Sequence, residues 1–314
     1  MVSKRKGKNI NGWIVIDKPA GITSTGVVNK IKWAFNAKKV GHSGTLDPDA
    51  TGVLPIALGE ATKTIPYIMD ELKSYQFCVK FGEATDTDDA TGKIIQTSSK
   101  RPSDDKISAM LQKYIGLIKQ TPPNFSAIKI NGTRAYDLAR EGLELKLNPR
   151  PIFVKDLKCL ERTDDEHALF QLTCGKGGYV RSIARDLGED LNCYAHVKWL
   201  RRVWAGPFTI ESCITIDQIQ ELHKSSKLLQ LLQPLELGLQ NLPFVRCSAK
   251  EFDDIANGRA VKVNSNNIKP DEKCWIQCEG KALALGNTKE SVFYPSRVFN
   301  LGKLISIQIM KRKN

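Results

Sequence analysis

The sequence predicts an α+β protein made of two domains. Its 314 residues are more than one domain usually holds, and 41% of them are hydrophobic, which is enough for a substantial core. Helix-like and strand-like segments follow one another irregularly, without the repeated βαβ pattern of a parallel sheet. The stretch Gln233–Pro243 begins and ends near prolines, and short strand-like segments follow it. We therefore expect one domain at 1–235 and a small β domain at 243–314.

The first expected elements are a strand, a turn and an amphipathic helix. Trp13–Asp17 is a short apolar run that ends at Lys18–Gly21, where proline and glycine interrupt strand pairing. Thr23 or Ser24 is suited to cap a helix N-terminus. The helix is predicted by apolar residues that return every three or four positions, namely Val27, Ile31, Ala34 and Phe35.

Gly41–Leu54, with the sequence GHSGTLDPDATGVL, is the most informative segment. Pro48 forces Asp47 towards an extended backbone, and glycines on both sides permit tight bends. We expect a sharply folded loop with a carboxylate at its tip. From the residues alone, three interpretations stay open: a turn whose acids cap backbone amides, a metal site at Asp47 and Asp49, or a nucleophilic or acid/base carboxylate.

The middle of the chain mixes both kinds of element. Ala61–Leu72 has a helical pattern with Pro66 near its centre, so we expect a break there. Apolar and polar residues alternate over Tyr75–Phe81, which predicts a half-buried strand. Thr85–Gly92 is an acidic, turn-rich segment, and Ser103–Tyr114 is expected to be a helix.

The remaining elements alternate in the same irregular way. Pro122–Gly142 begins as an irregular basic segment and is expected to end in a short helix near Arg134–Arg140. A helix is predicted from Arg181, with Ile183 and Leu187 on its apolar face. Strands are predicted at His167–Cys174, Lys273–Cys278, Ala282–Leu285 and Ile305–Met310.

Composition and charge narrow the class of protein. The formal net charge of +13 indicates a polyanionic partner, most simply a nucleic acid, although an anionic membrane surface would also attract it. No apolar run is long enough to cross a membrane, and the basic N-terminus leads into no signal-peptide core, so we expect a cytoplasmic location. The eight cysteines form no CxxC pair, and there is no P-loop or dinucleotide fingerprint.

Four motifs stand out along the chain. They are Gly41–Lys63, Tyr75 with Thr85–Thr87, Phe125–Tyr136, and Gly177–Leu191 leading to His196–Arg202. Together they resemble the TruB family of tRNA pseudouridine synthases, the enzymes that make pseudouridine 55 in the T-loop. They stand in the order and spacing of the family, and the resemblance extends from about residue 11 to residue 208. Two positions depart from the family pattern: Asp49 adds a second acid beside the expected catalytic one, and Gly178 stands where a threonine is common.

The resemblance implies a mixed, largely antiparallel sheet in the catalytic domain, an RNA-binding insertion at 119–150, and a PUA-like RNA-binding domain at the C-terminus. It also implies that the enzyme flips uridine 55 out of the tRNA T-stem-loop and isomerises it. No cofactor, metal or obligate protein partner is expected, and the protein is expected to be a monomer. Two alternatives stay open: a non-catalytic module that binds or folds tRNA, and a pseudouridine synthase for another RNA.

The resemblance also assigns roles to single residues. Asp47 is expected to be the catalytic carboxylate, held by a bidentate contact from Arg181, although the sequence does not choose between attack at C1′, addition at C6 and elimination through a glycal. Tyr75 would stack on the target base, with a core aromatic as the alternative interpretation. Tyr179 and Leu200 would line the uridine pocket, and His42 would help fill the space that the base leaves. Phosphate contacts are expected from Lys18, Lys129, Arg134 and Arg140, for which a solvated charged surface is the alternative.

Overall fold

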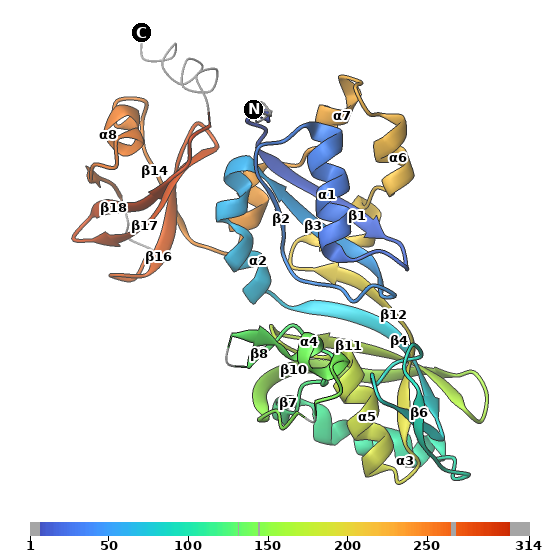
Figure 1. Cartoon of the computed structure of the whole chain (residues 1–314). Helices are drawn as coiled ribbons and strands as arrows, with labels where there is room; N and C mark the ends of the chain where they lie inside the picture. The colour runs from blue at the N-terminus through green and yellow to red at the C-terminus, as the bar shows by residue number, and fades with distance from the viewer. Residues whose placement is uncertain (1–6, 131, 144, 265–267, 302–314) are drawn as a thin grey trace.

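The computed structural model describes residues 7–130, 132–143, 145–264 and 268–301. Its N-terminal part is built on one long nine-stranded sheet, and a smaller five-stranded sheet forms the C-terminal part. Figure 1 shows the two sheets beside each other, with helices on the large one. The predicted α+β class is confirmed.

The large sheet is mixed and mostly antiparallel, as predicted. Its one parallel pair joins β12 to β3, with Arg201 opposite Thr51. The short strands β2 (Val40–His42) and β13 (Phe208–Thr209) pair with β3 and β12. Across the sheet, the order is β1 (Gly12–Lys18), β3 (Thr51–Leu58), β12 (Ala195–Ala205), β4 (Lys73–Phe81), β11 (His167–Cys174), β10 (Arg150–Arg162) and β7 (Gly116–Gln120).

β4 and β12 lie at the centre and join two halves of this domain (Figure 1). One half holds β1, β2, β3 and the helices α1 (Ser24–Phe35) and α2 (Ile65–Asp70). The other half holds β7, β10, β11 and the helices α3 (Asp104–Leu111), α4 (Ala135–Arg140) and α5 (Val180–Asp190). The segments that carry the sequence motifs therefore meet where the two halves join.

α1 forms as the sequence predicts. Thr23 caps it by accepting a hydrogen bond from the backbone of Gly26, and the helix ends at Asn36 in the left-handed conformation. The apolar face predicted from the spacing is the buried one, and it packs into the core of the large sheet. The N-terminus of α1 lies against the Gly41–Leu54 loop, because the Ser24 hydroxyl both donates to and accepts from the backbone of Leu46, at 2.9 Å.

The predicted helix break near Pro66 is confirmed, and it divides the expected helix into two elements. A 3-10 turn, Gly59–Lys63, ends before the proline, and α2 begins at Ile65, so Pro66 occupies the first turn, where its missing N–H costs nothing. The expected helix at 103–114 is α3 followed by a 3-10 turn, Gln112–Tyr114. The elements not yet placed are β5 (Glu83–Thr85), β6 (Ile94–Thr97), β8 (Lys129–Ile130), β9 (Thr133–Arg134), α6 (Ile216–Glu221) and α7 (Lys227–Gln230).

The C-terminal sheet has the strand order β14–β16–β17–β18–β15 and confirms a small β domain. The strands predicted at 273–278 and 282–285 are present, whereas the one predicted at Ile305–Met310 lies outside the described residues. The bounds are β14 (Phe244–Arg246), β15 (Val261–Lys262), β16 (Lys273–Cys278), β17 (Lys281–Lys289) and β18 (Val292–Val298), with α8 (Phe252–Ala256) beside them.

A shared apolar cluster joins the two sheets. Trp13 and Phe208 of the large domain lie in it together with Trp275 and Phe299 of the small one. The backbone N–H of Asn300 also donates to the carboxylate of Glu60 at 2.7 Å. The small domain is therefore anchored on the edge of the large sheet that carries β1 and β3.

Candidate active site

The Gly41–Leu54 segment is a tight loop between two strands. β2 ends at His42 and β3 begins at Thr51, so the loop is shorter than expected and its last residues belong to the sheet. Gly44 and Gly52 both have positive φ, +129° and +98°. A Cβ on Gly52 would lie 2.2 Å from the carbonyl oxygen of Arg202, so only glycine lets β3 approach β12 this closely. The loop holds Asp47 with 42% of its side chain exposed.

Arg181, the second residue of α5, forms an ion pair with Asp47. Its Nε lies 2.9 Å from Oδ2 of Asp47, and the arginine itself is buried. The expected bidentate contact is wrong, because the two terminal guanidinium nitrogens donate instead to the backbone carbonyls of Thr87 and Phe125, both at 2.9 Å. No hydrogen bond among the described residues involves Oδ1 of Asp47. One oxygen is thus fixed by a buried charge, and the other has no hydrogen-bond partner in the part of the chain that the structure describes.

The acidic segment 85–92 completes the support of Arg181. Oδ2 of Asp89 lies 3.7 Å from Nε of Arg181, and Asp88 pairs with Arg185, one helical turn further along α5, at 3.0 Å. Burial raises the pKa of Asp88 to about 6, against the opposite effect of Arg185 and Arg181. α5 is therefore fastened to this segment by two arginines, and that fixes the position of Asp47.

Lys18 is packed against the Asp47 loop and is not on the surface. Its side chain is completely buried, and its ammonium donates to the carbonyls of Pro19 at 2.9 Å and Pro48 at 2.7 Å. Burial lowers the pKa of Lys18 to about 8, while Asp49 and Asp47 act to raise it. The expected phosphate contact does not fit this position. Lys18 instead holds the backbone directly after Asp47.

Tyr75 and Arg202 lie together beside the loop. Tyr75 is nearly buried on β4; burial raises its pKa, and the positive charge of Arg202 opposes that shift. Arg202 is buried too, and donates to the carbonyls of Val53 at 2.7 Å and Gly44 at 3.2 Å. Arg202 was not predicted as a site residue, although Gly52 indicates a close backbone approach and Arg202 supplies the backbone that it approaches.

The other expected pocket residues lie on the neighbouring elements. Nδ1 of His42 accepts from the backbone of Gly44 at 3.3 Å, and burial, then Arg202, lowers the pKa of His42, which favours the neutral ring. Tyr179 precedes α5, and its backbone N–H and C=O are both bonded by the side-chain amide of Gln120, at 2.9 and 3.0 Å. Leu200 on β12 packs partly buried against the main core.

Two of the expected phosphate contacts lie on the surface of the 119–150 segment. Lys129 on β8 and Arg140 at the end of α4 are both exposed, and the guanidinium of Arg140 lies over the ring of Tyr136, 4.4 Å from its centre. The side chain of Arg134 lies outside the part of the chain that the structure describes. In the described ranges, no group of three or more His, Cys, Asp or Glu residues could hold a metal ion.

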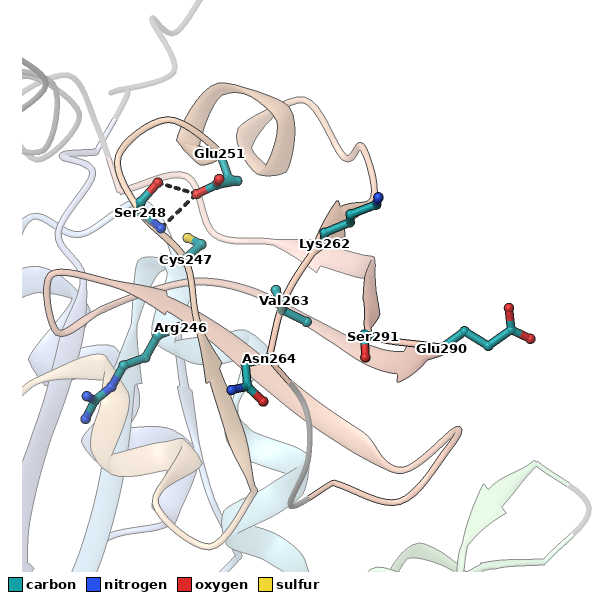
Figure 2. Close-up of a pocket in the computed structure, with 9 residues that line it drawn as sticks. All are labelled: Arg246, Cys247, Ser248, Glu251, Lys262, Val263, Asn264, Glu290 and Ser291. Carbon is teal, nitrogen blue, oxygen red and sulfur yellow. Dashed lines mark hydrogen bonds between the residues drawn. The ribbon is translucent and has the colours of Figure 1, made fainter.

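A separate pocket of about 640 Å³ lies in the C-terminal domain. Figure 2 shows Arg246 on one side of it and Lys262 on the other, at the two edge strands β14 and β15. Glu251 is engaged locally, because its carboxylate accepts hydrogen bonds from the backbone and hydroxyl of Ser248. In the part of the chain that the structure covers, no helix has the length and apolar character needed to span a membrane.

A mixed sheet that presents a half-exposed aspartate, held by a buried arginine at the start of a helix, is the arrangement that the motifs predict for a pseudouridine synthase. Two family models cover this region. Residues 32–180 match the N-terminal domain of TruB family pseudouridylate synthases, and residues 181–240 match the tRNA pseudouridylate synthase B C-terminal domain.

Similar proteins agree with these matches. The chain is 54% identical over 300 residues to tRNA pseudouridine synthase B of Ruegeria sp. (strain TM1040), covering 96% of this chain and 99% of that protein. It is 44% identical to tRNA pseudouridine synthase B of Bartonella henselae, over 95% of this chain and 99% of that protein. The chain therefore belongs to the TruB family of pseudouridylate synthases, which are isomerases.

Solved structures share the fold over most of the chain. The crystal structure of a Cbf5-Nop10-Gar1 complex matches with a TM-score of 0.71 and 27% identity, covering 92% of this chain and 84% of that one. An H/ACA RNP bound to a substrate RNA containing 2′-deoxyuridine matches with a TM-score of 0.70 and 25% identity, with the same coverage. The likeness extends beyond the residues that the family models match, and so includes much of the C-terminal β domain.

Proposed function

We propose that this protein isomerises uridine 55 in the T-loop of tRNA to pseudouridine. The relatives named tRNA pseudouridine synthase B support the reaction and the substrate. The observation that carries the proposal within this chain is the geometry of Asp47, which has one oxygen fixed by buried Arg181 and the other free. The reaction breaks the N1–C1′ bond and forms a C5–C1′ bond in the same nucleotide, so it needs no redox cofactor.

Asp47 is the group proposed to act on the flipped nucleotide. The guanidinium of Arg181 fixes the orientation of the carboxylate, which reduces the entropy lost in reaching the transition state. Oδ1 is available for attack at C1′ or at C6, or for assisting elimination through a glycal. Substrate specificity for uridine is assigned to Tyr75, Tyr179 and Leu200, which flank the loop.

Extrusion of the base is assigned to the same region. Flipping a base costs a few kcal/mol of lost stacking, and groups that fill the vacated space offset that cost. His42 stands on the strand directly before the catalytic loop, where a neutral ring can enter the RNA. Lys129 and Arg140 are proposed to contact phosphates from the 119–150 insertion.

The C-terminal domain is proposed to be a PUA-like RNA-binding domain beginning near Pro243. Arg246 and Lys262 stand on opposite edges of its pocket, and Arg246 lies 5.6 Å from the centre of the exposed Phe244 ring. Cations beside an exposed ring suit contact with phosphate and base. The proposal also includes a cytoplasmic monomer without an obligate protein partner, which fractionation and mass measurement in solution would test.

Pseudouridine formation on a T-stem-loop RNA and on full-length tRNA is the direct test. Asp47→Asn removes the charge at nearly constant volume, so we expect a folded protein that binds tRNA but forms no pseudouridine. Asp49→Asn is the matched control two residues away, exposed and without a contact to Arg181, and it should retain activity. Normal turnover by Asp47→Asn would refute the catalytic assignment.

The same experiment separates the two alternatives. A wild-type protein that binds tRNA without modifying any position would be a binding or folding module. Pseudouridine mapping of cellular RNA with and without the protein would show whether another RNA is the substrate.

A further inference from the structure

Trp33, on the outer side of α1, has no role in the proposed site. With 62% of its surface exposed, it is the most exposed aromatic residue in the described part of the chain. A single exposed apolar residue is common on protein surfaces, so a role for Trp33 depends on how its ring is held and on the charges around it.

The ring of Trp33 is held in place despite its exposure. It stacks on the imidazole of His223, with ring centres 4.0 Å apart and planes 22° from parallel. Nδ1 of His223 lies 3.2 Å from the carbonyl oxygen of Ala34, on α1 itself. A carbonyl oxygen only accepts hydrogen bonds, so Nδ1 carries the proton and the imidazole is fixed to the helix. One face of the indole is therefore covered and the other is open.

The two segments that carry the stacked rings are basic, although α6, which packs against α1, carries Asp217 and Glu221. Residues 24–39 and 222–231, which carry the two stacked rings, contain no aspartate or glutamate. In the described residues, none of the lysines of these segments takes part in an ion pair. All are exposed: Lys30, Lys32, Lys38, Lys39, Lys224 and Lys227.

We propose that the open face of Trp33 is a stacking platform for an unpaired nucleotide of the RNA substrate, with the surrounding lysines contacting its phosphates. An exposed ring with free cations around it is the combination that binds single-stranded nucleic acid, because any base can stack and every phosphate is attracted. A protein partner would need a strongly acidic surface with an apolar anchor, so the charge favours RNA. The inference rests on the proposed function and extends it to a second contact.

The position of the platform indicates which part of the RNA it contacts. The N-terminus of α1 is bonded to Leu46, next to the catalytic aspartate, and Trp33 lies about 14 Å further along the helix axis. Figure 1 shows α1 and α6 side by side there, away from the insertion that carries α4. The proposal places the nucleotide bound by Trp33 outside the T-stem-loop that enters the active site, and the comparison of two RNA substrates below tests this placement.

Trp33→Ala should raise the Kd and KM for full-length tRNA by roughly five- to a hundred-fold and leave kcat unchanged. It should leave the KM for an isolated T-stem-loop RNA at the wild-type value. Trp33→Phe should retain part of the affinity. Leu229→Ala is the control: this residue is 53% exposed on the nearby α7 but has no ring, so tRNA binding should be unaffected.

A second readout is independent of turnover. Stacking should quench the tryptophan fluorescence when tRNA binds, and the quench should be smaller in Trp33→Phe, where only other tryptophans such as Trp199 can contribute. Lys30→Ala with Lys224→Ala should reduce the slope of log K against log salt by about 1 to 2. Wild-type Kd and unchanged quenching in the Trp33 variants would overturn the platform and leave a protein-docking surface. If the wild-type enzyme does not modify tRNA, the proposed function fails, while the Kd measurements still decide the platform.

Discussion

Single residues in this site act mainly by fixing the backbone around one carboxylate. Arg181, Arg202 and Lys18 are all buried cations, and between them they donate to six backbone carbonyls. A buried charge is costly unless it is paired or fully hydrogen-bonded, and here the loop carbonyls and Asp47 supply the partners. The loop conformation and the burial of these cations therefore depend on each other.

Arg181→Met is expected to separate binding from chemistry. It leaves the carbonyls of Thr87 and Phe125 without their donor, which costs about 1–3 kcal/mol for each buried group. Asp47 loses its fixed orientation, so kcat should fall by about 10²-fold or more while the Kd for tRNA changes little. Urea denaturation, single-turnover kinetics and tRNA binding measure the three quantities.

Arg181→Lys is the informative companion variant. A lysine keeps the positive charge but cannot serve Asp47 and two separate carbonyls at once. We expect an intermediate kcat and an intermediate stability. Full activity in Arg181→Met would show that the contact with Asp47 has no part in the reaction.

Lys18→Met tests the buried lysine through pH. The pKa of Lys18 is lowered by burial from 10.5 to about 8 in the folded protein. The folded chain therefore binds fewer protons than the unfolded chain between these values, so its relative stability rises with pH there. This contribution is complete above pH 10.5 and is lost as pH falls through 8.

The contribution of Lys18 to the pH dependence of stability is the difference between the wild type and Lys18→Met. Between pH 7.5 and pH 10, the stability of the wild type should rise by about 2 kcal/mol relative to Lys18→Met, as measured by urea denaturation. A pH-independent difference would mean that Lys18 keeps its ordinary pKa. An opposite slope would mean that the ammonium is stabilised by Asp47 and Asp49 more than it is destabilised by burial.

Some of the single residues of the site could be predicted from the sequence. Asp47, Tyr75, Tyr179 and Arg181 could be singled out because they stand in a specific motif order. The partners of Arg181 could not, because a carbonyl such as that of Phe125 leaves no mark on the residue type. Lys18 was placed on the surface because a lysine in a turn usually lies there.

Among the elements, β3 and β12 determine the position of the loop that holds Asp47. They form the parallel pair of the large sheet, and their contact requires glycine at position 52. Gly52→Ala combines an unfavourable positive φ with a clash against backbone, and should cost about 3 kcal/mol or more. Activity should fall with it, because the strand starts directly after the loop.

Gly21→Ala is the matched control for this prediction. Gly21 also has a positive φ, +80°, but an added Cβ would meet nothing within 4 Å. Only the backbone strain of the positive φ remains, so the free energy of unfolding should fall by about 1–2 kcal/mol. Thermal denaturation of both variants measures the difference, and equal losses would show that the close approach to Arg202 is not needed.

The predictability of the elements follows from their regularity. α1 and β11 keep one period throughout, and both were predicted close to their observed bounds. β10 and β12 were not identified, and both contain register shifts, at Val154/Asp156 and at Val197/Trp199 among others. The extra residue of a bulge shifts the alternation of apolar and polar residues by one position, so the regular pattern that identifies a strand is interrupted.

At the scale of the whole molecule, the two sheets share a core. The change of pattern near Gln233–Pro243 suggested a separate small domain, but nothing in the sequence shows that Trp275 and Phe299 pack with Trp13 of the large one. Contacts between residues more than 200 positions apart leave no local periodicity. The ammonium of Lys63 also donates to the carbonyl of Val298 at 2.8 Å, which adds a polar bond at the edge of the shared cluster.

Phe299→Ala should uncouple the two domains without unfolding the small one. Phe299 is 5% exposed and lies in the shared cluster, so its truncation should cost about 3–5 kcal/mol, mostly at the interface. Phe293→Ala is the contrast, because this fully buried ring belongs to the core of the small domain alone. In hydrogen exchange, Phe299→Ala should deprotect the amide of Asn300 and leave β16 and β17 protected, whereas Phe293→Ala should deprotect β16 and β17. Loss of protection in β16 and β17 to the same degree in both variants would mean that the small sheet is stable only when it is docked on β1 and β3.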